Sequence, residues 1–223
     1  MLSTSPAPAP AEPGPSRRRR KEARPQELLD AALDLFVEKG FAATKMDDVA
    51  ARAGVSKGTV YLYFPSKEEL LKAVIRHNLT LTISQVDDLV DQFEGSTADL
   101  MRLAAATWWE QVGATQASGI FKLIITEVRN FPDLAAFYAQ EVIEPGERLL
   151  VRLLQRGVDR GEFRTTPNPL DTAHSLIFPL LMLCLHKHSI GACPSADAIV
   201  HDPRRFIDNH LDLMLQGLLA RTA

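Results

Sequence analysis

The segment 47–64 restricts the fold more than any other part of the chain. Its residue pattern predicts a short helix, a turn that contains Gly54, and a second short helix that begins near Lys57. Glycine often ends a helix because it adopts left-handed backbone angles without strain. Thr44 is expected to cap the first of these helices and Ser66 the helix that follows them, since each precedes an acidic residue by three positions. The pattern as a whole is typical of a helix-turn-helix unit.

Helical periodicity continues through most of the remaining chain. Hydrophobic residues make up 46% of the sequence, enough for a sizeable core, and no stretch shows the period-two alternation of a half-buried strand. We therefore expect an all-α protein of about nine helices, with Pro145 and Pro179 kinking or splitting two of them. The expected helices cover residues 25–39, 44–53, 57–64, 67–93, 97–112, 119–130, 133–160, 170–189 and 203–219.

The second short helix is expected to carry an outer face that its own domain does not bury. With about 100° between successive residues, Val60, Phe64 and Tyr61 point toward the two preceding helices. The opposite side carries Gly58, Thr59, Leu62 and Tyr63. A short helix that exposes a glycine, a leucine and a tyrosine together needs a cover, and we expect that cover to be DNA.

Each outward residue suits a contact with double-stranded DNA. Gly58 allows close approach of the backbone, Leu62 and the Thr59 methyl group can meet thymine methyl groups, and Tyr63 can reach a base or a phosphate. The flanking residues expected to contact the phosphate backbone are Thr44, Lys45, Lys57 and Lys67.

The stretch "GFAATKMDDVAARAGVSKGTVYLYFPSKEELL", residues 40–71, resembles the signature of TetR-family transcriptional regulators, and the preceding helix also fits. The resemblance implies DNA contacts by Thr44, Lys57, Thr59, Tyr61, Tyr63 and Lys67. Leu62 departs from the polar or aromatic residue that is frequent there, which leaves the operator preference open. The run "TEVRNFPDLAAFY", residues 126–138, resembles the AefR-like branch, and the rest of the chain resembles the family in length and helix count.

Charge is distributed unevenly along the chain. The net charge is −3, but residues 1–75 carry 12 Lys and Arg against 10 Asp and Glu, with a concentrated run, "SRRRRKEAR", at residues 16–24. Residues 1–23 are poor in apolar side chains, so we expect a disordered basic arm that is either solvated or lies on DNA. The expected division is this arm at 1–23, a helix-turn-helix domain at 24–70, and a helical ligand-binding and dimerisation domain at 71–223.

The last two expected helices have more apolar surface than one partner can cover. The helix 170–189 is apolar nearly all round. The final helix carries one stripe of Ile207, Leu211, Met214 and Leu218, and a second of Phe206, His210 and Leu213. We therefore expect a homodimer through these helices, which would also pair two recognition helices on DNA. The alternative is a central helix fully buried in a monomer.

Enzyme and metal signatures are missing from the sequence. There is no Gly-rich phosphate loop, GxSxG or HExxH motif, and His186 and His188 fall on different helix faces. We expect no catalytic residues, no metal and no cofactor. Cys184 and Cys193 are expected to be free thiols in the cytoplasm, and no apolar run is long enough to predict a membrane span.

We expect a repressor that a small effector releases from its operator, and the apolar character of the candidate contacts favours a hydrophobic or amphipathic effector. The candidate effector contacts are Trp108, Phe121, Phe137, His174, Phe178 and Met182. The helix 67–93 is expected to transmit the signal, with Leu81, Val86 and Leu89 packed in the larger domain. The alternatives are a ligand-independent DNA-binding regulator or activator and, from another class, an all-helical enzyme or carrier.

Overall fold

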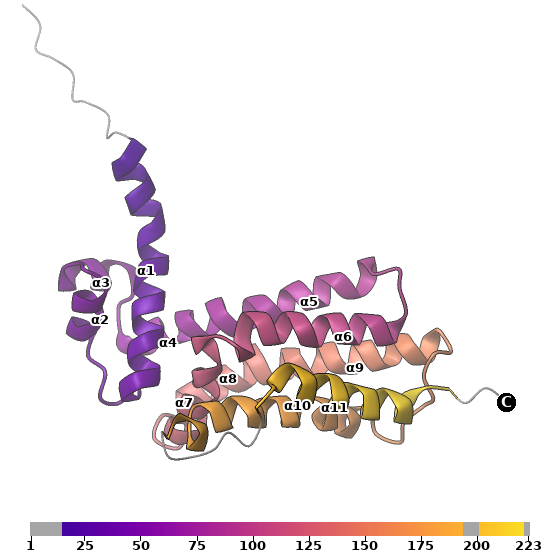
Figure 1. The fold of residues 1–223 in the computed structure, drawn as a ribbon. Helices are drawn as coiled ribbons and strands as arrows, with labels where there is room; N and C mark the ends of the chain where they lie inside the picture. Colours follow the sequence, from indigo (N-terminus) through magenta and orange to yellow (C-terminus); the bar gives the residue numbers. More distant parts are fainter. Residues whose placement is uncertain (1–14, 194–200, 221–223) are drawn as a thin grey trace, which may run out of the picture.

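The computed structural model describes residues 15–193 and 201–220, which form helices and no strands (Figure 1). The all-α prediction is confirmed. The α-helices are α1 (Pro15–Lys39), α2 (Met46–Arg52), α3 (Lys57–Tyr63), α4 (Lys67–Ile75), α5 (Leu81–Gln92), α6 (Thr97–Trp108), α7 (Gly119–Glu127), α8 (Pro132–Tyr138), α9 (Glu144–Asp159), α10 (Pro169–Lys187) and α11 (Pro203–Leu218).

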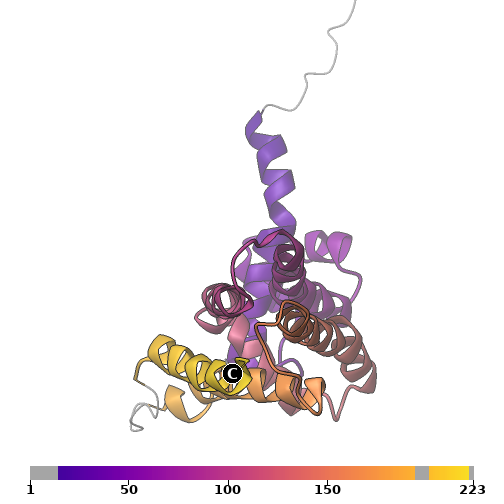
Figure 2. The same cartoon turned by 90° about the vertical axis from the view of Figure 1, so that its right-hand side faces the viewer.

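The helices form a small unit and a larger bundle. α1, α2 and α3 lie together at one end of the molecule, and α4 runs from them into α5 along the bundle (Figure 1). α10 packs against α7, α9 and α11, and the turned view shows α11 at the margin of the bundle (Figure 2). The small unit therefore meets the bundle through α4 and through the contacts of α1 with α7.

The described residues contain three π-helical turns, two of which join consecutive α-helices while one extends the end of a helix. The turn Arg76–Thr80 joins α4 to α5, Trp109–Gly113 extends α6, and Ala139–Ile143 joins α8 to α9. With each joined pair counted once, and the short 3₁₀ turns set aside, the described residues contain nine helices, as the sequence predicted.

The connecting helix packs only some of its predicted apolar residues against the bundle. Val86 is buried and Leu89 partly buried, as predicted, but Leu81 is 50% exposed. All three lie on α5, after the first π-helical turn, and at about 100° per residue Leu81 lies about 140° from Val86. The prediction for Leu81 is therefore wrong because its position on α5 faces away from the buried stripe.

The third π-helical turn lies directly before Pro145. Proline has no N–H, so the carbonyl of Glu141, one helical turn earlier, loses its usual partner. The Thr80 hydroxyl donates to this carbonyl at 3.1 Å, and the Arg76 guanidinium donates to the Glu141 carboxylate at 2.8 Å. These bonds fasten the α8–α9 joint to the α4–α5 joint. α10, by contrast, continues through Pro179 without a split.

α1 begins earlier than the sequence predicted. Residues 15–23, expected to belong to a disordered arm, are helical, and α1 continues through Pro25. Proline is frequent in the first turn of a helix and the arginine run has no apolar periodicity, so the pattern favoured a start at Pro25. Residues 1–14 of the predicted arm lie outside the described residues.

A glycine turn sets the angle between α2 and α3. Gly54 has a φ of 65°, a left-handed conformation that suits glycine. Its N–H donates to Ala51 O at 3.2 Å, and the N–H of Val55 donates to Ala50 O at 2.9 Å, which together form a Schellman ending. Ser56 then accepts a backbone N–H with its side chain and caps α3.

The two predicted threonine and serine caps have different outcomes. Ser66 caps α4 as predicted, since its Oγ accepts a backbone N–H at 3.1 Å. The cap of α2 is Lys45, without a side-chain bond, so the prediction for Thr44 is wrong. The buried Thr44 hydroxyl instead donates to Gly40 O at 2.8 Å and Leu35 O at 3.2 Å, which ties the loop to the end of α1.

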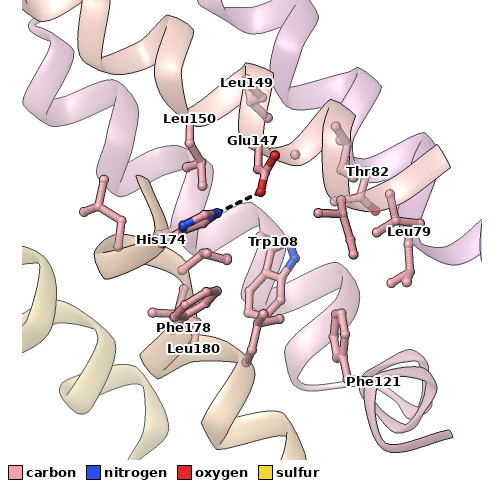
Figure 3. A pocket seen from close by; sticks show the side chains of 18 of the residues that line it. Leu79, Thr82, Trp108, Phe121, Glu147, Leu149, Leu150, His174, Phe178 and Leu180 are labelled. Carbon is pink, nitrogen blue, oxygen red and sulfur yellow. Dashed lines mark hydrogen bonds and ion pairs between the residues drawn. The ribbon is translucent and has the colours of Figure 1, made fainter. Parts of the chain in front are cut away.

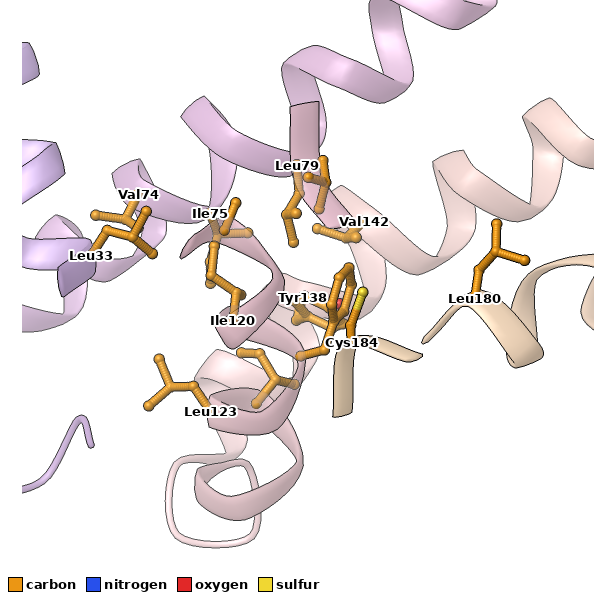
Figure 4. Packing of buried hydrophobic residues seen from close by; sticks show 14 of the residues in the cluster. Leu33, Val74, Ile75, Leu79, Ile120, Leu123, Tyr138, Val142, Leu180 and Cys184 are labelled. Atoms are coloured by element: carbon orange, nitrogen blue, oxygen red, sulfur yellow. The ribbon is translucent and has the colours of Figure 1, made fainter. Parts of the chain in front are cut away.

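One hydrophobic core extends through both parts of the molecule (Figure 4). Leu33 of α1 lies beside Val74 at the α4 end of this cluster, and Leu180 of α10 belongs to the same cluster at the other end. Cys184 is a free thiol in this core, and burial raises its pKa to about 12. It is therefore packed as a small apolar side chain and not poised as a nucleophile.

The small unit and the bundle approach each other closely at Gly119. A Cβ added there would lie 2.6 Å from both methyl carbons of Val37 on α1, which is closer than real Cβ contacts allow. Next to it, Ser118 Oγ lies 2.8 Å from His188 Nε2 at the end of α10. Burial, with Lys187 and another lysine nearby, lowers the pKa of His188. The neighbouring Lys187 ammonium donates to three backbone carbonyls of the loop 113–115.

We expect Gly119→Ala to lower the free energy of unfolding by about 1–3 kcal/mol, the usual cost of overpacking. The added methyl group would force α1 and α7 apart or distort Val37. Gly58→Ala is the matched control, because its added Cβ meets only Ser56 Oγ at 3.8 Å. Alanine is a better helix former than glycine, so this control should keep or raise stability by up to about 1 kcal/mol. Equal unfolding curves for the two variants in urea would contradict the close contact.

Candidate DNA-binding surface and ligand cavity

The α3 helix presents most of its surface to solvent. Val60 is fully buried against the neighbouring helices, whereas Leu62 is 78% exposed and Tyr61 is 44% exposed. Gly58 is exposed, and Thr59 is half-buried with its hydroxyl 2.9 Å from Ser56 Oγ. We call the exposed side formed by Lys57, Gly58, Thr59, Tyr61 and Leu62 the α3 outer face.

The two tyrosines of α3 lie opposite to the prediction. Tyr61 was expected to face inward and Tyr63 outward, but Tyr61 is exposed and Tyr63 is partly buried against the core. α3 ends at Tyr63, and Phe64 has extended backbone angles. The inward direction is therefore set by Val60 alone, and Tyr63 lies about 60° from it while Tyr61 lies about 100° away.

The lysines that were expected to contact phosphates differ in the partners of their ammonium groups. Lys45 is exposed at the start of α2. The Lys57 ammonium pairs with Asp47 at 2.8 Å and lies 6.0 Å from the centre of the Tyr61 ring. The hydrogen bond to Asp47 raises the pKa of Lys57, so this ammonium stays charged beside the face.

Lys67 was expected to be an exposed phosphate contact, but its ammonium is used inside the small unit. Its Nζ donates to Phe41 O at 2.7 Å and Ala42 O at 3.2 Å, and it lies 4.4 Å from the centre of the Phe41 ring. Lys67 thus fastens the α1–α2 loop to α4. Together with the buried hydroxyl of Thr44, it supports the surface from behind.

A large cavity lies inside the bundle (Figure 3). It has a volume of about 750 Å³, within the range of small-molecule sites, and its wall is built from α5 to α11 with the first and third π-helical turns. Five of the six predicted effector contacts lie on this wall: Trp108, Phe121, His174, Phe178 and Met182. The helical periods of α6, α7 and α10 bring these distant residues together.

Phe137 does not line the cavity. Its ring lies 5.7 Å from the Lys72 ammonium and 4.8 Å from the Arg76 guanidinium, both at the α4 end of the connecting helix. The prediction placed Phe137 by its aromatic character alone. Its side of α8 packs on α4, and its neighbour Tyr138 contributes to the cavity wall instead.

The cavity contains one carboxylate that the sequence analysis missed. Glu147 Oε1 lies 2.7 Å from His174 Nε2, and the Phe178 ring stacks on His174 at 5.0 Å between centroids and 8° between planes. Glu147 lies one turn after Ile143 and one turn before Leu150, which also line the wall. A carboxylate within an apolar helical stripe was the available signal for this residue.

Glu127, a carboxylate on α7, does not line the cavity. Its Oε1 lies 3.2 Å from the position of a Cβ added at Gly40, so this carboxylate faces the small unit. Among the described residues, no group of His, Cys, Asp and Glu side chains has the arrangement of a metal site.

We expect Lys67→Met to lower the free energy of unfolding by about 1–3 kcal/mol, because two carbonyls would lose a charged donor. Lys57→Met, which breaks an exposed ion pair, should have a much smaller effect in the same urea titration. Equal effects of the two substitutions would contradict the supporting role of Lys67.

The sequence matches family models in both of its parts. Residues 28–74 match "Bacterial regulatory proteins, tetR family", and residues 94–202 match "Tetracyclin repressor-like, C-terminal domain". The HTH-type transcriptional repressor KstR2 of Rhodococcus jostii is 30% identical over 199 residues, which cover 89% of this chain and 92% of that protein. The uncharacterized HTH-type transcriptional regulator YfiR of Bacillus subtilis is 32% identical over 155 residues, or 68% of this chain and 73% of that protein.

Solved structures share the fold at lower identity. The fatty acid degradation regulator FadR from Bacillus halodurans has a TM-score of 0.70 at 20% identity, over 95% of this chain and 100% of that one. SmeT, in its complex with triclosan, has a TM-score of 0.71 at 22% identity, over 89% of this chain and 92% of that one. From its helix-turn-helix, its family matches and its relatives, this chain belongs to the TetR family of DNA-binding transcriptional regulators and is not an enzyme.

Proposed function

We propose that this regulator is a cytoplasmic homodimeric repressor that leaves its operator when a hydrophobic or amphipathic small molecule enters the cavity. The observation that carries the proposal is the apolar cavity itself, because its wall includes the connecting helix that leads to the DNA-binding unit. The names given to two similar proteins support this proposal. KstR2 is named a transcriptional repressor, and SmeT has been solved with triclosan.

The α3 outer face is the proposed contact with DNA. Gly58 lets the backbone approach the bases, Thr59 and Leu62 read base edges in the major groove, and Tyr61 reaches a phosphate. Lys45 adds a phosphate contact from the start of α2, and Lys57 adds another from α3. Tyr63, Lys67 and Thr44 contribute by orienting this surface, since their side chains are partly or wholly buried.

α10 and α11 are the proposed dimer interface. α10 with the turn after it, Pro169–Ala192, is apolar enough and long enough to span a membrane by composition, yet only 22% of its apolar window is buried within the chain. Phe178 and Met182 on α10 and Leu213 on α11 are more than half exposed. A second copy of this surface would cover them and place two α3 helices on one operator.

Two structural links can carry the effect of a bound molecule to α3. The first is the connecting helix, in which Leu79, Val86 and Thr82 line the cavity and α4 contacts α1. The second is α10, which lines the cavity and whose end reaches the Val37–Gly119 contact through His188. A molecule that prefers an arrangement of these helices in which α3 no longer fits the operator binds with negative coupling to the operator. A ligand-independent regulator or an activator, the alternatives, would lack this coupling.

We expect Gly58→Ala to weaken operator binding at least about tenfold, the effect of roughly 1.4 kcal/mol, because a methyl group would hold the α3 backbone away from the bases. The open space around Gly58 keeps the fold intact. The operator would be obtained by selecting fragments of random DNA with the full-length protein, and binding measured by fluorescence anisotropy. Unchanged affinity of a normally folded variant would exclude close contact at Gly58, and failure to select any fragment would refute the proposed function.

We expect Leu213→Glu to give a folded monomer with at least about tenfold weaker operator binding, because a charge would be buried between the two copies. Leu81→Glu is the matched control, since Leu81 is also an exposed leucine but lies on α5. Light scattering after size exclusion gives the mass of each variant. A dimeric Leu213→Glu protein would place the interface elsewhere.

A further inference from the structure

The carboxylate of the cavity lies between α9 and α10. Among the described residues of the wall, Glu147 is the only Asp, Glu, Lys or Arg, and the remainder of the wall is mainly aliphatic and aromatic. Its partner His174 stacks on the ring of Phe178. The side chains of His174 and Glu147 are 31% and 30% exposed in one protomer, so the pair lies at the edge of the cavity, and Figure 3 shows its hydrogen bond near the rings of Phe178 and Trp108.

We propose that the cavity takes an elongated apolar molecule with a hydrogen-bond donor at one end, an alcohol or an amine, and discriminates against the corresponding carboxylate. The donor end would lie at the Glu147–His174 pair and the apolar part against the rings of Trp108 and Phe121, which pack on each other with centroids 6.1 Å apart. This inference rests on the proposed function, because it names the chemistry of the effector for the same cavity.

The acceptor oxygens of Glu147 decide which head group is accepted. A carboxylate only accepts hydrogen bonds, so the imidazole of His174 donates its Nε2–H to Glu147 Oε1. The Glu147 carboxylate keeps lone pairs that this bond does not use, and these offer acceptors to a ligand. A hydroxyl or ammonium group can donate to these acceptors, and an ammonium bond is the stronger because it is charge-assisted.

A carboxylate ligand meets the opposite situation. It would have to leave water and lie beside the Glu147 carboxylate in an apolar cavity, where like charges repel more strongly than in water. The wall supplies no Lys or Arg among its described residues to compensate. Discrimination between donor and carboxylate head groups should therefore come from this single residue.

The test compares three probes with the same alkyl chain, dodecan-1-ol, dodecylamine and dodecanoate, at neutral pH, the alcohol below its solubility limit and the two ions below their micelle concentrations. Calorimetric titration of the full-length protein should give Kd values for the alcohol and the amine at least about tenfold below that of the carboxylate, the size of one charged hydrogen bond. This ranking needs no variant and so does not depend on a substitution that could disturb folding.

Glu147→Gln should reduce the difference between the alcohol and the carboxylate to less than about threefold and weaken amine binding, because the negative charge is removed while the shape is kept. Glu144→Gln is the matched control. It lies on the same helix, is exposed and pairs with Arg148, so it should leave the ranking unchanged.

Three results would overturn the inference: no binding by any probe, a carboxylate that binds the wild type as tightly as the alcohol, or a ranking that Glu147→Gln leaves unchanged. A separate titration with operator tests the proposed function. If a probe binds with the predicted head-group ranking but its affinity is the same with and without operator, the inference about Glu147 stands and the release mechanism fails.

Discussion

The contact of Val37 with Gly119 holds the DNA-binding unit against the bundle, and the rest of the structure is arranged around it. Because glycine has no Cβ, α1 and α7 can approach until the valine methyl groups fill the space where a side chain would be. Ser118 and Lys187 then join the loop before α7 to the end of α10. The same hydrophobic core continues from α1 into α10, so the small unit and the bundle share one core.

Much of the fold could be predicted because helix boundaries and apolar periods are local properties. Gly54 and Ser66 act as the sequence indicated, and the buried stripe of α11 contains Ile207 and Leu211 as expected. The errors in the DNA-binding unit arose because the hydrogen-bond acceptors of two side chains are brought close only when the chain folds. Lys67 resembles an exposed basic residue until the carbonyls of the α1–α2 loop are placed beside it, and Thr44 resembles a cap until its hydroxyl finds the end of α1.

The cavity was harder to predict than the helices that form it. Trp108, Phe121 and Phe178 were found because they are large and lie on apolar stripes, but the same criterion wrongly included Phe137, which faces α4. A stripe shows which side of a helix is inward, but not whether the opposing helices meet or leave a space. The position of Glu147 is compatible with its charge because of that space. On an interface where the helices pack without a cavity, burial of the same carboxylate would be strongly unfavourable.

The π-helical turns have a consequence for how this protein can vary. Such a turn holds one residue more than the α-helical turn it replaces, so it can arise or disappear by insertion or deletion of a single codon without breaking the helix. Leu79 in the first turn and Val142 in the third contribute to the cavity wall. Loss of one residue at either place would turn the next stretch of helix and present different side chains to the cavity. The shape of the cavity is therefore open to change by chain length as well as by substitution, while the distant α3 keeps its own sequence.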